Sequence, residues 1–258
     1  MKIGITTILK PDEKVIFFAS LKSKEMNMPY FERSGLLSLM SERYEIEGFL
    51  IYGRRLPVFW TKEGIYKFHL GTAVLRIKNL QEGNSDRLCS LLPDDCHDLL
   101  DCTFGHGGDA TVLSYYLKDK GKITSLEKSR VLYEIGKSGI EKFADKNETI
   151  TEGLRKISLL HVDFREYLEK AENRSFDVIY FDTMFKHPVK REMNNVESFR
   201  HIAHYDELTK ETLIEAMRVA RKRIIIKERP FSKIFRSGLF TEIYNKKGQS
   251  TAYGVIDL

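Results

Sequence analysis

A buried strand that runs into a glycine-rich loop constrains the fold of this chain most. A short apolar run, Leu99 and Leu100, ends in Asp101, and Gly105, Gly107 and Gly108 follow before a helical pattern begins. A strand, a glycine loop and a helix form the first unit of a nucleotide-type α/β domain. Glycine permits a positive φ or a close approach of backbone to ligand, and a helix start offers unpaired N–H groups. A plain strand-to-helix turn uses the same residues, so the unit alone leaves both interpretations open.

The next predicted strand, 122–127, favours the nucleotide interpretation. It ends in Glu127, 26 positions beyond Asp101. Folds of this type place the carboxylate that holds a ribose at that point. The G-x-G-x-x-G spacing of a dinucleotide site is absent, so a pyrophosphate is not the expected ligand of this loop.

Strand and helix patterns alternate from residue 98 onward. Strands are predicted over 98–102, 122–127, 157–161, 176–182 and 223–228. Helices are predicted over 109–118, 129–143, 164–171 and 208–221. Such alternation favours a parallel sheet with helices on both faces. Residues 240–244 and 250–256, joined by a glycine-containing turn, then predict a closing antiparallel hairpin.

The beginning of the chain has a different pattern. It contains a predicted helix over 12–27 and predicted strands over 2–9, 45–52, 57–61 and 65–69. Gly83 and Asn84 mark the best candidate boundary. The sequence therefore predicts an N-terminal α/β module over 1–83 and a second domain over 84–258, which opens with a short helix over 85–92.

The composition excludes several classes of protein. With 42% hydrophobic and 31% charged residues, the chain is typical of soluble globular proteins, and its longest apolar runs are too short to cross a bilayer. Its start lacks the apolar segment of a secretory signal. The three cysteines have no metal-ligand spacing, so we expect reduced thiols, no metal site and a cytoplasmic location. The net charge of +5 permits a polyanionic partner without requiring one.

Acidic residues stand at the ends of four consecutive predicted strands. They are Asp101, Glu127, Asp163 and Asp182. The carboxyl ends of parallel strands meet at one edge of a sheet, where ligands bind. Each acid taken alone is compatible with a helix-capping role. The set favours a site for a cofactor with hydroxyl, amine and amino-acid groups.

This arrangement resembles the class I S-adenosylmethionine (SAM) methyltransferases, which have a Rossmann-like sheet. In that family the glycine loop passes the methionine part of SAM, the acid after the second strand binds the ribose, and the acid after the third lies near the adenine. The resemblance implies that Glu127, with Lys128 adjacent, binds the ribose, and that Asp163 and Phe164 meet the adenine. The remaining cofactor-binding residues that it implies are Asp101, Thr103, Phe104, Gly105, Gly107, Gly108, Asp109 and Asp182.

The residues around the fourth predicted strand resemble the RsmJ family in particular. Residues 178–188, Val-Ile-Tyr-Phe-Asp-Thr-Met-Phe-Lys-His-Pro, and the Lys-Arg-Glu-Met that begins at Lys190 are similar to that family's Asp-Pro-Met-Phe-Pro-His-Lys and Lys-Lys-Glu-Met stretches. Residues 218–230 resemble its basic turn and fifth strand. Thr183 and Lys186 stand where the family has proline. RsmJ enzymes methylate the exocyclic N2 of a guanine in small-subunit ribosomal RNA, so the resemblance, over roughly 85–258, implies that activity.

Methylation of an exocyclic amine requires placement of the nitrogen in line with the methyl group and an acceptor for the amine N–H. Asp182 can supply the acceptor, and Phe185 can stack on the base. We predict these two residues as the catalytic ones. A core aromatic at the end of the sheet is the alternative for Phe185.

Basic residues follow the fourth and fifth predicted strands. They are Lys186, Lys190, Arg191, Lys227, Arg229, Lys233 and Arg236. A run of charge is often only a solvated face. Both loops lead to the reactive end of the cofactor, however, so we expect them to follow a phosphate backbone. His187 either contacts a phosphate or shapes the turn at Pro188.

The sequence thus predicts a SAM-dependent methyltransferase that acts on RNA, at guanine N2 of ribosomal RNA. Two alternatives stay open: a methyltransferase for another nucleobase or a small amine, and a non-catalytic protein that binds SAM or RNA. The presence of Glu127, Asp163 and Asp182 together favours an enzyme, since a decayed pocket is expected to lose some of them.

Overall fold

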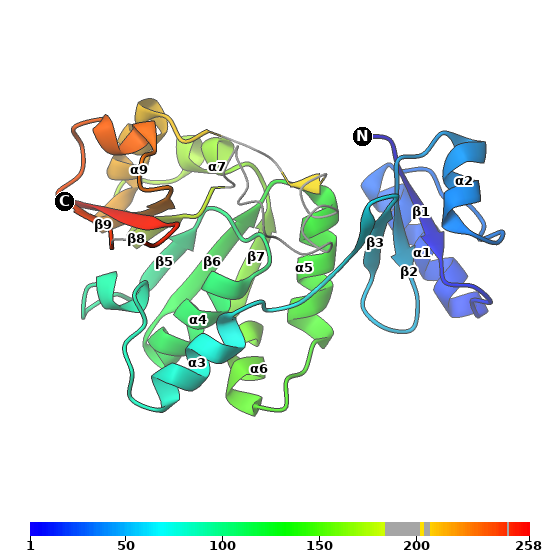
Figure 1. Ribbon diagram of the computed structural model, residues 1–258, viewed down its shortest axis with the longest axis horizontal. Coiled ribbons are helices and arrows are strands. Elements are labelled where there is room, and N and C mark those ends of the chain that lie inside the picture. The colour runs from blue at the N-terminus through cyan, green and yellow to red at the C-terminus, as the bar shows by residue number, and fades with distance from the viewer. Residues whose placement is uncertain (184–201, 204–206, 247) are drawn as a thin grey trace. The chain divides into compact units, whose positions relative to one another are not determined.

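The computed structural model describes residues 1–183, 202–203, 207–246 and 248–258 (Figure 1). These residues fall into two compact units. The first holds Met1–His69, Ser129–Phe143 and the described residues 202–203. The second holds Leu70–Lys128, the described residues from Ala144 to Thr183, and those from Glu207 to Leu258. The division of the chain into domains at residues 83 and 84 stays a prediction.

Seven strands of the described residues form one sheet in the second unit. Their order is β10-β11-β9-β8-β5-β6-β7. Their bounds are Asp98–Asp101 (β5), Lys122–Glu127 (β6), Ile157–His161 (β7), Phe176–Phe181 (β8), Ala220–Glu228 (β9), Glu242–Tyr244 (β10) and Ala252–Asp257 (β11). The strands from β5 to β9 pair in parallel, while β11 is antiparallel to both β9 and β10. The predicted α/β fold, with parallel strands closed by an antiparallel hairpin, is therefore confirmed.

Helices cover both faces of this sheet. The α-helices among the described residues of the unit are α3 (Ala73–Gln81), α4 (Gly108–Leu117), α6 (Glu148–Arg155), α7 (Phe164–Lys170) and α9 (Lys210–Val219). Leu100 and Ile179 belong to a buried cluster with side chains of α7 and α9. Successive strand residues point to opposite faces, and on the other face α4 contacts β6 and lies against α3 and α6 (Figure 1).

Two of these helices were not predicted from the sequence, and one predicted helix is shorter. Helix α6 begins where the Asn147 side chain accepts a hydrogen bond from the backbone N–H of Thr149. Helix α3 begins at Ala73, and Thr72 before it makes no side-chain cap bond. The helix predicted over 85–92 is reduced to the single 3₁₀ turn Cys89–Leu91.

The first unit contains a smaller sheet in the order β1-β2-β3-β4. Its elements are β1 (Ile3–Thr7), α1 (Glu13–Met26), α2 (Leu37–Tyr44), β2 (Gly48–Tyr52), β3 (Val58–Thr61), β4 (Gly64–Lys67) and α5 (Arg130–Lys142). Strands β1 and β2 are parallel, and the other pairs are antiparallel. Helix α5 joins this unit through Glu134, which pairs with Lys22 of α1 at 3.2 Å.

Among the described residues, no helix is long and apolar enough to span a membrane. The three cysteines, Cys89, Cys96 and Cys102, are buried and free. No cluster of three or more acidic, histidine or cysteine side chains suited to a metal occurs in the described part of the chain.

Candidate active site

The four predicted acids lie at the carboxyl ends of neighbouring parallel strands. Asp101 is the last residue of β5 and Glu127 the last of β6. Asp163 follows β7, and Asp182 follows β8 directly. The strand order β8-β5-β6-β7 therefore brings all four acids to one edge of the sheet, as predicted.

The Asp101 carboxylate holds the first residues of the glycine loop in place through hydrogen bonds. The carboxylate is buried and accepts hydrogen bonds from the backbone N–H of Thr103 and from Ser125 Oγ, both at 3.0 Å. Burial raises the pKa of Asp101 to about 7. With both oxygens bonded inside the protein, Asp101 fixes the start of the loop.

The glycine loop connects the ends of three strands. Gly105 and Gly107 have φ of +55° and +74°, which favour glycine. The backbone N–H of Gly105 donates to the Glu127 carboxylate at 3.1 Å. Thr103 Oγ1 accepts from the backbone N–H of Asp182 at 2.7 Å. At Gly108 a Cβ would lie 3.2 Å from the carbonyl oxygen of Leu70, so this helix start also needs a small residue.

Asp163 has two roles that the sequence could not separate. It caps α7 by accepting from the backbone N–H of Arg165 at 2.8 Å, as the capping interpretation predicts. Its other oxygen lies 2.7 Å from Lys128 Nζ. Phe164 is buried with its ring edge-on to Phe181, and the guanidinium of Arg165 lies 5.0 Å from the Phe164 ring centre. Lys128 and Asp163 therefore form a charged pair beside a largely covered aromatic ring.

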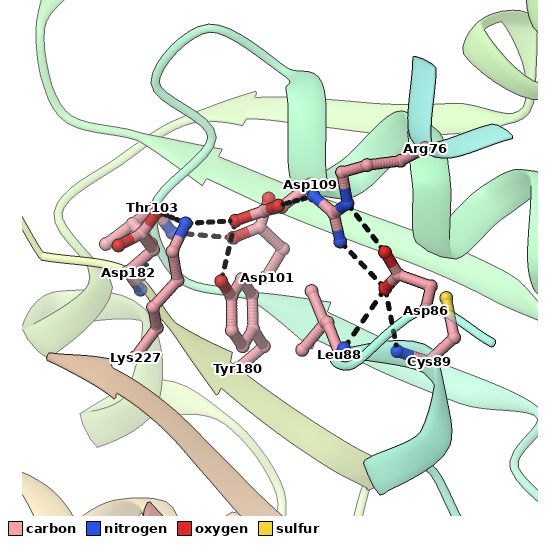
Figure 2. A network of polar contacts seen from close by, with 10 residues as sticks. All are labelled: Arg76, Asp86, Leu88, Cys89, Asp101, Thr103, Asp109, Tyr180, Asp182 and Lys227. Atoms are coloured by element: carbon pink, nitrogen blue, oxygen red, sulfur yellow. Dashed lines mark hydrogen bonds and ion pairs between the residues drawn. The ribbon is translucent and has the colours of Figure 1, made fainter. Parts of the chain in front are cut away.

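A network of charged groups surrounds Asp109 in the first turn of α4 (Figure 2). Lys227 Nζ lies 2.6 Å from a carboxylate oxygen of Asp182 and 2.9 Å from one of Asp109. The hydroxyl of Tyr180 donates to the same Asp109 oxygen at 2.7 Å. One ammonium thus connects the carboxylate after β8 with the carboxylate that follows the glycine loop.

Arg76 of α3 forms the other end of this network. Its guanidinium contacts the second oxygen of Asp109 and makes two bonds to Asp86, at 2.7 and 2.9 Å. Asp86 in turn accepts from the backbone N–H groups of Leu88 and Cys89 (Figure 2). The two parallel bonds to one carboxylate fix the orientation of the Arg76 guanidinium.

The network shifts the pKa values of its members in opposite directions. Burial alone would raise the pKa of Asp109, but Lys227 and Arg76 outweigh it and hold that pKa well below the usual range. Burial raises the pKa of Asp182, and the nearby Asp109 adds to the rise while Lys227 opposes it. Asp182 also keeps 28% of its side chain exposed, against 14% for Asp109. Asp182 is therefore the more accessible and the more readily protonated of the two acids.

The other predicted site residues are placed as follows. Phe104 is buried, and Arg229 donates through its guanidinium to the carbonyl oxygen of Ser250 at 3.3 Å. Lys233 and Arg236 are exposed on the 3₁₀ turn Lys233–Arg236. The predicted residues Phe185, Lys186, His187, Lys190 and Arg191 lie outside the described residues.

The sequence predicted Lys227 as a phosphate contact, and the structure places its ammonium between two carboxylates. Arg76, Asp86 and Tyr180 were not predicted as members of the site. Tyr180 carried a usable signal, because a hydroxyl inside a buried strand needs a partner. Nothing in the helical segment around Arg76 distinguishes that residue from a surface cation.

A family model described as putative SAM-dependent methyltransferase matches residues 67–248 of the chain. The chain belongs to this family. SAM is therefore its cofactor, and the chain is a SAM-dependent methyltransferase. The site fits this cofactor, because Glu127 and Asp163 present hydrogen-bond acceptors and the ribose hydroxyls and amine groups of SAM are donors.

Two relatives extend over nearly the whole chain. The protein YpiP of Bacillus subtilis is 30% identical over 98% of both chains. Ribosomal RNA small subunit methyltransferase J of Haemophilus influenzae is 24% identical over 90% of this chain and 88% of its own length. A crystal structure of a SAM-dependent methyltransferase from Neisseria gonorrhoeae has a TM-score of 0.63 and 14% identity, covering 98% of this chain and 95% of its own. That structure shows that the fold is shared.

Proposed function

We propose that this methyltransferase acts on an exocyclic base nitrogen of RNA, and that the target is guanine N2 in small-subunit ribosomal RNA. The observation that carries the proposal is the position of Asp182. Its partly exposed carboxylate follows β8 directly, beside the glycine loop, and is fixed by Lys227 at 2.6 Å. The similarity to ribosomal RNA small subunit methyltransferase J over 90% of the chain supports the choice of RNA.

Bound SAM supplies an electrophilic methyl group on sulfur. The protein must then position the target amine and stabilise the positive charge that develops on its nitrogen. Asp182 is proposed to accept a hydrogen bond from the amine N–H, which directs the nitrogen lone pair towards the methyl group. Its raised pKa suits the carboxylate to take up the proton that the nitrogen loses after transfer.

The remaining roles are those that the family resemblance implies. Glu127 is proposed to bind the ribose hydroxyls, and the Lys128–Asp163 pair to border the adenine. The glycine loop is proposed to lie against the methionine part. Phe185, outside the described residues, stays the candidate for stacking on the base. In a duplex, guanine N2 donates a hydrogen bond to the paired cytosine and the base is held in the stack, so the substrate base is expected to be unpaired or flipped.

The proposal is tested by methyl transfer from labelled SAM to small ribosomal subunits isolated from a strain that lacks this gene. Mass spectrometry of the nucleosides then identifies the product, which we expect to be N2-methylguanosine. Transfer to a different base would correct the target but keep the RNA substrate. No transfer to any ribosomal particle or free ribosomal RNA would overturn the proposal and favour a small-molecule amine.

A further inference from the structure

The first unit has a hollow at the carboxyl end of β2, with a volume of about 260 Å³. Apolar side chains of Val15, Phe18, Tyr52 and Pro57 form part of its lining. The rings of Phe18 and Tyr52 pack edge to face with centres 5.5 Å apart. Val15, Tyr52 and Pro57 are buried, so the hollow has a firm apolar lining.

Four cations surround this lining, and we call the site the basic hollow. They are Lys14 of α1, Arg54 and Arg55 of the turn after β2, and Lys142 of α5. All four are exposed. Among the described residues, the salt bridge at the basic hollow is the one between Arg54 and Asp12 at 3.3 Å, with both side chains largely solvated. Such a pair is weak and screened by salt, so the basic hollow keeps a positive field.

The opposite end of β2 is richer in acidic side chains. A second hollow there is lined by Glu45, Glu47 and Glu63, and its cations are Lys62 and the terminal ammonium of Met1, which pairs with Glu47. Glu47 directly precedes β2, whereas Arg54 follows shortly after β2 ends. The acids at this end are partly balanced by the Met1 ammonium and by Lys2, which pairs with Glu45. Over the described part of the chain, the lining of the basic hollow contains four cations and no acid. Such an excess of positive charge attracts an anionic partner.

The contacts of Phe18 indicate which part of a polyanion fits. The ammonium groups of Lys142 and Lys22 lie 5.7 and 5.6 Å from the centre of its ring. Cations therefore already occupy positions over the aromatic surface that a stacked base would need. The apolar lining can pack against the C–H groups of a ribose whose hydroxyls stay in water. The surrounding cations can pair with the phosphates on either side of it.

From these observations we infer that the basic hollow binds the sugar–phosphate backbone of an RNA strand, and so anchors the substrate at the first unit. The identity of this RNA as the methylated substrate rests on the proposed function. Binding of RNA at the basic hollow is a separate claim, because it depends on Lys14, Arg54, Arg55 and Lys142 and not on the acids at the sheet edge.

The test compares double variants of the full chain in binding to a short fluorescent oligouridine across a salt titration. Lys14→Ala with Arg55→Ala removes two of the cations. Each phosphate contact on a single strand contributes about 0.7 to the salt slope, so the slope should fall by about 1.4 and the affinity near 0.1 M salt by about 25-fold. Lys14→Arg with Arg55→Lys keeps both charges and should bind like the wild type.

Lys2→Ala with Lys62→Ala is the matched control. It removes two exposed cations of the same unit, which pair with Glu45 and Glu42, and should leave the salt slope unchanged. SAM affinity, measured by calorimetry, should be the same for all variants and shows that they are folded.

An unchanged slope in the Lys14→Ala, Arg55→Ala variant would overturn the inference, as would an equal loss in the Lys2→Ala, Lys62→Ala control. Competition by polyaspartate as strong as competition by RNA would replace RNA with an acidic protein partner. Methyl transfer to small subunits by the wild type, combined with an unchanged slope, would leave the proposed function intact without this inference. The expected slope change without any methyl transfer to RNA would overturn the proposed function alone.

Discussion

Lys227 Nζ lies 2.6 Å from the carboxylate of Asp182 and 2.9 Å from that of Asp109. Two carboxylates that share one ammonium do not behave alike, since Asp109 also contacts Arg76 and Tyr180. Asp109 is held ionised by these partners, whereas the cation that lies beside Asp182 in the network of Figure 2 is Lys227. The protonation of Asp182 therefore depends on Lys227.

Replacement of Lys227 by methionine should move the pH dependence of methyl transfer. Without the ammonium, burial and the charge of Asp109 act on Asp182 unopposed, and its pKa rises further. The acid limb of the rate–pH profile should shift upward by about one unit or more. Lys227→Arg keeps the charge and should leave the limb close to its original position. If the acid limb of the Lys227→Met profile stays at the wild-type pH, Lys227 does not control the protonation of Asp182.

Replacement of Glu127 by alanine should weaken SAM binding by roughly 2–3 kcal/mol, because two charge-assisted hydrogen bonds to the ribose are lost. Calorimetry with SAM measures the change. Glu127→Gln keeps an acceptor for the backbone N–H of Gly105 and should lose less. Glu152→Ala, at an exposed position of α6, is the control. Unchanged affinity in Glu127→Ala would take this residue out of the cofactor site.

The sheet and the acids at its edge were predictable because each strand and the acid that ends it are adjacent in the sequence. Parallel topology then brings Asp101, Glu127 and Asp182 to one edge without further information. The helices are less evident in the sequence. Helix α6 is preceded by Asn147, a residue type that the sequence marks as a helix cap. Helix α3 is preceded by a threonine that makes no cap bond.

The charged network was not predictable, because its members meet only through packing. Arg76 and Asp109 are 33 positions apart, and Lys227 and Asp109 are 118 apart. A lysine after a strand looks the same in the sequence whether it faces a phosphate or a carboxylate. Which of the two it faces depends on how α3 and β9 pack against the start of α4. No local sequence pattern encodes that packing.

Asp177 should make the stability of the fold depend on pH. Its carboxylate accepts from the backbone N–H of His97 at 2.8 Å and pairs with Arg221 and Lys222 at 2.8 and 3.3 Å. Burial alone would raise the pKa of Asp177, but the hydrogen bond from Arg221 and those from the backbone outweigh it and hold that pKa well below its usual value. A depressed acid pKa contributes stability that is fully present above the unfolded value, near 3.9, and is lost as the pH falls below it.

Asp177→Asn should therefore lower the free energy of unfolding by about 2 kcal/mol at pH 7, since bonds to a charged acceptor become bonds to a neutral amide. The gap between wild type and variant should shrink as the pH falls from about 4 towards 2. Urea denaturation at a series of pH values measures it, with Glu152→Gln as the exposed control. A gap that stays constant over this range would show that the ionised carboxylate contributes nothing specific.

The last prediction concerns Asp182 itself. Asp182→Asn preserves size but replaces a charged acceptor with a weaker neutral one beside Lys227. Methyl transfer should fall by roughly 10²-fold or more, as expected for the loss of one preorganised electrostatic contact. RNA affinity should change little, because phosphate contacts supply most of it.

A labelled-methyl assay on small subunits from the deletion strain, run beside oligouridine binding, separates these two effects. The control is Asp119→Asn, which removes an exposed carboxylate that pairs with Lys156 on the surface and should leave both measurements unchanged. Loops or helix ends should be better substrates than duplex RNA, because the base must leave its pair to reach the Asp182 carboxylate. Full activity of Asp182→Asn would refute its assigned role. An equal fall in transfer and RNA binding would instead make Asp182 a determinant of docking, because a residue that only orients the amine has no effect on the bound backbone.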